Sequence, residues 1–143
     1  QILQGTDKIM IVYGFAEANR TIHMDKENPE PPPLDTWMGR SHGSWEGNTL
    51  VVDAQGFNGE AWFDRSGNFA SSALRVTERY TPINADALLY EATIEDPTVF
   101  TRPWQIRMPL YRRLEPNARV LEYKCVEFSE EILYGHLMKK EEE

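Results

Sequence analysis

The stretch ALRVTERYTPINADALLYEATIED, residues 73–96, alternates apolar and polar side chains on both sides of a short polar segment. A period of two is typical of β-strands, so this stretch predicts a hairpin whose turn is centred near Ala85. In this register the apolar residues of both strands share one face of the hairpin. They are Leu74, Val76, Tyr80, Tyr90, Ala92 and Ile94, and the acidic Glu78 lies among them.

The other face of this hairpin supports the same register. It sets Arg79 against Glu91 and Arg75 against Glu95, with Thr77 opposite Thr93. Opposite charges and threonine pairs directly across an antiparallel ladder each contribute about 0.2–1 kcal/mol. The same register therefore groups the apolar residues on one face and pairs opposite charges on the other.

A second hairpin precedes it in TWMGRSHGSWEGNTLVVDAQGFN, residues 36–58. Gly47-Asn48 suits a two-residue turn of the primed type, because glycine accepts the positive φ that such turns require. Pairing outward from this turn sets His42 against Asp53. One face then carries Trp45, Leu50 and Val52 with the small residues Gly39, Ser41 and Gly43. The other face carries Arg40, His42, Ser44, Val51 and Asp53.

Toward the N-terminus, residues 8–14 and 19–24 read as two paired strands. The proline-rich residues 25–35 predict a surface loop, since proline removes ladder donors. The loop of residues 59–72 is rich in Gly, Ser and Asn, and its aromatic side chains are expected to cover one end of the fold: Trp62, Phe63 and Phe69.

Toward the C-terminus, residues 98–114 alternate around Pro103 and Pro109 and therefore predict an edge or bulged strand. Residues 118–128 predict a returning strand, with Cys125 as a buried small hydrophobe inside it. Residues 129–140 predict a helix capped by Ser129. Its apolar residues are expected to dock on the sheet: Ile132, Leu133, Leu137 and Met138.

These elements predict an all-β fold in a single domain of residues 1–143. Its antiparallel meander of about eight strands closes into a small, lipocalin-like barrel with one C-terminal helix. A two-sheet β-sandwich is the alternative.

Composition narrows the function. The formal charge of −8 repels phosphate backbones, so nucleic acid is not an expected partner. No apolar run approaches the ~20 residues that span a bilayer, so no membrane insertion is expected. A single cysteine cannot form an internal disulfide. A homodimer is compatible with the sequence.

Two acidic positions are candidates for catalysis. Asp53 could orient the His42 ring and leave its other nitrogen as a base; the alternative is a surface pair. Glu78 lies in an apolar row, where desolvation favours the protonated acid; the alternative is neutralisation by Arg102 or another basic residue.

Ligand binding is the other candidate chemistry. Arg40, Arg75 and Arg79 share one face and would hold a carboxylate or phosphate if that face lined a cavity. The aromatic side chains expected at such a pocket are Trp45, Tyr80, Tyr90 and Trp104. The histidines His23, His42 and His136 lack ligand spacing, so no metal site is predicted. No phosphate loop or nucleophile elbow indicates a cofactor or a hydrolase.

The segments TWMG, WEG, TLVVD, GFN, WFDRSG, VTERY and IEDPTVFTRPW together resemble a group of small exported proteins of soil and other environmental bacteria. The resemblance spans nearly the whole chain and implies a periplasmic or secreted protein whose export signal has been removed. It implies no reaction. Members of the group carry histidine at the positions of Arg40, Ala70 and Arg75.

Three functions follow as hypotheses. The first is a barrel that binds an apolar or amphipathic small molecule, including an anionic one, in its mouth. The second is an enzyme doing acid-base chemistry, as an isomerase, lyase or hydrolase, in the same pocket. The third is a carbohydrate-binding module that uses exposed tryptophans.

Overall fold

The computed structural model describes residues 1–24, 34–64, 66–124, 126 and 128–137. Its strands are β1 (Ile2–Gln4), β2 (Lys8–Val12), β3 (Asn19–His23), β4 (Arg40–Glu46), β5 (Thr49–Gln55), β6 (Arg75–Asn84), β7 (Ala87–Glu95) and β8 (Trp104–Tyr111). A short helix, α1 (Ser129–Tyr134), continues into a 3₁₀ turn at Gly135–Leu137.

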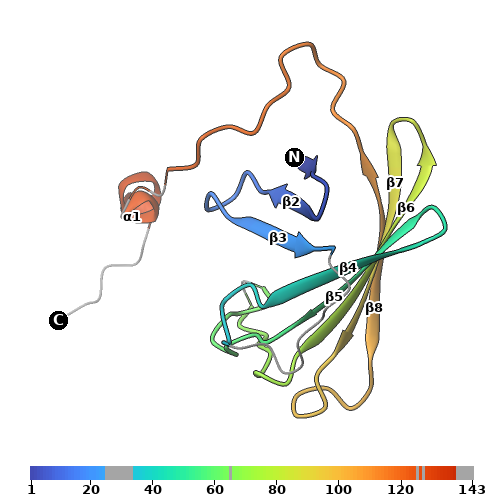
Figure 1. The fold of residues 1–143 in the computed structure, drawn as a ribbon. Coiled ribbons are helices and arrows are strands. Elements are labelled where there is room, and N and C mark those ends of the chain that lie inside the picture. The colour runs from blue at the N-terminus through green and yellow to red at the C-terminus, as the bar shows by residue number, and fades with distance from the viewer. Residues whose placement is uncertain (25–33, 65, 125, 127, 138–143) are drawn as a thin grey trace.

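The eight strands form one sheet in the order of the sequence, and this sheet curls through 212° as half a barrel. The bend brings β2 and β3 to stand across the interior from β7 and β8 (Figure 1). The predicted all-β, barrel-like fold is confirmed. The alternative of two packed sheets is not the one formed.

Both predicted hairpins have the expected register. His42 pairs with Asp53 in the β4–β5 ladder, and Gly47 in the turn has a φ of 60°. In the β6–β7 ladder Arg79 pairs with Glu91, and Tyr80 pairs with Tyr90. The turn chemistry and the alternation of side chains therefore agree with the observed register, although Arg79 forms its ion pair with Glu46 and Glu91 forms its own with Arg107.

The meander is interrupted at one ladder. The strands β3 and β4 pair in parallel, through Ile22 with Ser41 and His23 with His42. An entirely antiparallel meander was therefore the wrong expectation at this point. The physical reason is the long connection of residues 24–39, because a parallel pair needs a crossover of about a dozen residues or more.

The two edges of the sheet differ from the prediction. The edge strand β1 was not predicted, and residues 118–124 are not the returning strand that was expected. The edge is β8 itself, where Pro109 has no N–H to offer to a further strand. Cys125, expected inside that strand, lies outside the described residues.

In the described residues the C-terminal α-helix ends at Tyr134, where a 3₁₀ turn follows, and it stands apart from the sheet (Figure 1); Met138 and the predicted end of the helix at residue 140 lie outside the described residues. Its N-cap is Phe128, in a left-handed conformation without a side-chain cap, so Ser129 is not the N-cap. Ile132 and Leu133 are 70% and 59% exposed and do not dock on the sheet. Six helical residues have little intrinsic stability, so the apolar pattern alone did not determine packing.

The core lies on the concave side of the sheet. One cluster joins Ile9 and Ile22 on β2 and β3 to Leu50 and Val52 on β5. The strand β4 lies between β3 and β5, and at Gly43 its backbone comes close to the side chain of Met24. A Cβ atom at position 43 would lie 2.6 Å from the Met24 sulfur. A second cluster packs against β7 and β8, and its buried members are Ala70, Leu74, Ala92 and Ile94.

Candidate functional site

The concave face of β5 and β6 carries the apolar row predicted from the sequence. Every second residue of β5 is buried, and Glu78 of β6 is buried among them with 4% of its surface exposed. The face that lines the interior is therefore the apolar one. The polar row of the same strands lies on the outer face.

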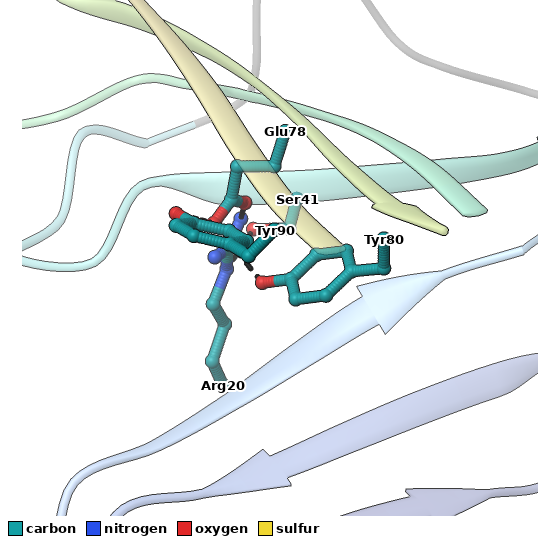
Figure 2. Close-up of polar contacts among 5 residues, drawn as sticks. All are labelled: Arg20, Ser41, Glu78, Tyr80 and Tyr90. Atoms are coloured by element: carbon teal, nitrogen blue, oxygen red, sulfur yellow. Dashed lines mark hydrogen bonds and ion pairs between the residues drawn. The ribbon is translucent and has the colours of Figure 1, made fainter. Parts of the chain in front are cut away.

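Glu78 accepts hydrogen bonds on both of its carboxylate oxygens (Figure 2). Arg20 donates from Nη2 to Oε2 over 2.5 Å. The Tyr90 hydroxyl donates to Oε1 over 2.8 Å, and the Tyr80 hydroxyl donates to the same oxygen over 3.1 Å. The carboxylate is thus satisfied although it is buried in an apolar row.

Arg20 reaches Glu78 across the interior. It lies on β3, which is separated from β6 by β4 and β5 in the sheet. Its Nε also donates to Ser41 Oγ over 2.6 Å, and its side chain is only 9% exposed. Arg20 thereby links three strands of the curl. A buried ion pair is tolerated when further hydrogen bonds satisfy it, as they do here.

The protonation of these groups follows from their burial and from their neighbours. Burial raises the pKa of Tyr80 and Tyr90 well above that of a free tyrosine, and the nearby Glu78 carboxylate raises both further. Both hydroxyls therefore stay protonated and act as donors. For Arg20, burial alone would lower the pKa, but the hydrogen bond and charge of Glu78 outweigh it and raise the pKa.

A cavity of about 250 Å³ lies in the interior beside Arg20 and Glu78. Arg20 and Glu78 form its charged end, and its other walls are mainly apolar, including Ala54, Phe57, Leu74 and Val76. Tyr80 and Tyr90 are bonded to Glu78 but do not themselves line the cavity. The cavity is thus an apolar space with one charged end.

Aromatic residues surround the opening of this cavity. Trp37 and Trp62 both line it and are 60% and 72% exposed, so the cavity reaches the surface there. Phe63 also lines it and packs against Phe100 and Trp104, at ring-centroid distances of 6.0 and 5.9 Å. The loop of residues 59–72 therefore contributes Trp62 and Phe63 to the lining of the cavity, whereas Phe69, which was expected to cover the same end of the fold, is 57% exposed.

His42 and Asp53 are cross-strand neighbours, but on the outer face. Arg75 donates to both carboxylate oxygens of Asp53, from Nε over 2.9 Å and from Nη2 over 2.8 Å. Neither His42 nor Asp53 lines the cavity that contains Glu78. The structure therefore separates the two predicted catalytic groups onto opposite faces.

The three predicted arginines do not converge on this cavity either. Arg75 and Arg79 are half-exposed on the outer face, with Asp53 and Glu46 as their partners. Arg40 is partly buried at the start of β4.

Two of the predicted aromatic residues lie away from the charged end. Trp45 is 51% exposed near the hairpin turn, where it pairs with Leu50. Trp104 belongs to the cluster with Phe63 and Phe100.

Among the described residues, no three His, Cys, Asp or Glu side chains are grouped so that they could hold a metal ion. No helix in the described part of the chain is both long and apolar enough to cross a membrane.

With the fold and the cavity described, the chain can be compared with known proteins. No family model, no curated protein and no solved structure matches it. The cavity and the side chains around it are therefore the basis for a function.

Arg20 is the site residue that was not anticipated from the sequence, where Arg102 or another basic residue was the expected partner of Glu78. The alternation of side chains in residues 19–23 is the sequence signal that indicates Arg20. In residues 19–23 Arg20 falls on the same face as the buried Ile22, so it is a charge inside an apolar row. Glu78 is the corresponding anomaly of opposite sign. Arg20 and Glu78 are opposite charges that each lie in an apolar row and need a counter-ion, so each predicts the other as its partner.

Proposed function

We propose that this protein binds a small apolar or amphipathic molecule in the cavity between Glu78 and the aromatic opening. The observation that carries the proposal is the cavity itself, whose walls are apolar and whose one end is charged. Small-molecule sites have this composition, in which apolar walls supply affinity and a few polar groups fix orientation.

The size of the cavity limits the ligand. Its volume of about 250 Å³ lies slightly below the range of roughly 300–1,000 Å³ that is usual for drug-sized ligands. The expected ligand is therefore an alkyl chain of medium length or a small ring system. Its polar end would lie on the side of Arg20, which is already held in place by Glu78 and Ser41.

The alternative of acid-base catalysis has less support. Both oxygens of Glu78 already accept hydrogen bonds, so proton transfer to a substrate would compete with this network. His42 and Asp53 lie on the outer face, away from the cavity. Binding therefore requires fewer changes in the observed arrangement than catalysis does.

The carbohydrate-binding alternative depends on Trp37 and Trp62, which are exposed at the opening. It predicts that the protein is retained on insoluble polysaccharide and that Trp62→Ala abolishes the retention. Membership of the exported bacterial group, and a periplasmic or secreted location, remain proposals that rest on the sequence motif.

The binding proposal is tested by filling the cavity. Ala61 lines it and is exposed, so Ala61→Trp should narrow the opening without disturbing the core. The probe is 1-decanol, followed by the change in tryptophan fluorescence and by calorimetry. We expect saturable binding to the wild type and a loss of affinity of about tenfold or more in Ala61→Trp, which corresponds to at least ~1.4 kcal/mol.

Ala85→Trp is the matched control, because Ala85 is an exposed residue of the β6–β7 turn and does not line the cavity. It should bind the probe as the wild type does. The proposal is overturned if decanol does not bind, or if both variants bind it equally well.

A further inference from the structure

A second cavity, of about 290 Å³, lies where β3 and β4 begin. The parallel ladder between these strands contains only two residue pairs, Ile22 with Ser41 and His23 with His42. On the N-terminal side of these two pairs, no backbone ladder joins β3 to the described residues that precede β4. The space is lined by residues of β3 and by the segment that leads into and begins β4, among them Arg20, Met38 and Arg40.

The lining of this second cavity is polar and basic. Arg20 and Arg40 both contribute to it, and no carboxylate is present among the lining residues that the structure describes. Asn19, Thr21 and Thr36 add side chains that can donate hydrogen bonds. Such a lining favours an anion over a neutral or cationic group.

Arg40 contributes the most informative atom. Its Nε is buried and has no hydrogen-bond partner within the described chain. A buried donor without a partner costs free energy, so such groups are rare in native proteins. Arg20, by contrast, donates to Glu78 and Ser41. Among the described residues that line this cavity, Arg40 is therefore a cation whose Nε–H is available to a ligand.

The two cavities are adjacent, since Arg20 and Met38 line both of them. Met38 is 39% exposed, and the methionine side chain is unbranched and adapts readily to its surroundings. A ligand can therefore place its apolar part in the first cavity and its head group in the second by displacing the side chain of Met38.

We propose that the ligand is an amphipathic anion whose carboxylate or similar head group binds Arg40 in the second cavity. This inference rests on the proposed function, because it assigns the apolar part of the ligand to the first cavity. The guanidinium of Arg40 offers the planar fork that matches a carboxylate, and the head group would satisfy its orphaned Nε.

The test compares decanoate with 1-decanol, which share a chain length and differ in the head group. At neutral pH calorimetry should show that the wild type binds decanoate at least about tenfold more tightly, as expected for a charge-assisted hydrogen bond. Arg40→Gln should abolish this preference, so that decanoate binds no more tightly than decanol. Arg40→Lys, which keeps the charge but loses the fork, should show an intermediate preference.

Arg79→Gln is the matched control, since Arg79 is paired with the exposed Glu46 and lines neither cavity. It should retain the preference for decanoate. If Arg40→Gln also retains it, or if the wild type binds both probes equally, the inference fails. The proposed function then still stands, provided that Ala61→Trp weakens binding of both probes. If neither probe binds, both proposals fail.

Discussion

Glu78 and Asp53 are carboxylates on the neighbouring strands β6 and β5, and each accepts hydrogen bonds from an arginine. They lie on opposite faces of the sheet. Glu78 is 5% exposed at its side chain and is bonded by Arg20 from a distant strand. Asp53 is 23% exposed and is bonded by Arg75 from the adjacent strand.

The difference shows how burial changes the effect of the same chemical pair. On the outer face water solvates both charges, so the pair of Asp53 and Arg75 contributes little to stability. In the interior the loss of either partner leaves a charge without solvent and without a counter-ion. The two pairs should therefore respond very differently to equivalent substitutions.

The largest effect is expected for Glu78→Gln. It leaves the Arg20 charge buried without its partner, and it should lower the free energy of unfolding by about 3–5 kcal/mol. Urea denaturation measures this change. The double variant Arg20→Met/Glu78→Leu removes both charges and should recover most of the loss. A single variant as stable as the wild type would contradict the role of the interior pair.

A smaller effect is expected at alkaline pH. The pKa values of Tyr80 and Tyr90 are raised in the folded protein, whereas an unfolded tyrosine ionises near pH 10. Their contribution to stability is fully present below about pH 10 and is lost as the pH rises above it. Tyr90→Phe should therefore show a shallower fall of Tm above pH 10 than the wild type, measured by thermal melts at increasing pH. An unchanged slope would show that Tyr90 does not couple folding to protonation.

The smallest effect is expected for Asp53→Asn on the outer face. The free energy of unfolding should fall by only about 0–1 kcal/mol, because the pair with Arg75 is partly solvated. The same urea titration used for Glu78→Gln gives the comparison directly. A loss as large as that of Glu78→Gln would mean that the two faces are not energetically distinct.

The sequence predicted those parts of the fold that local patterns determine. The turn at Gly47 and the alternation of apolar and polar side chains specify neighbouring strands, and both registers were confirmed, although Arg79 is bonded to Glu46 and not to its cross-strand neighbour Glu91. The buried position of Glu78 followed from the same alternation. These features depend only on residues that are close in the chain or in adjacent strands.

Other features depend on contacts that alternation does not encode. Arg20 meets Glu78 only because the sheet curls, and period-two patterning does not give the direction of a curl. Residues 118–124 have a strand-like pattern, yet the edge they would join contains Pro109. The parallel pairing of β3 with β4 likewise depends on a long connection rather than on a local signal.

The short ladder between β3 and β4 has a consequence for how the molecule moves. Its two residue pairs stand between ladders of five pairs, for β2 with β3, and seven pairs, for β4 with β5. Local opening starts where the fewest backbone hydrogen bonds must break. The backbone ladder between β3 and β4 should therefore be the first to open, and its amide hydrogens should exchange sooner than those between β6 and β7, while the ion pair of Arg20 with Glu78 still holds β3 to the rest of the sheet.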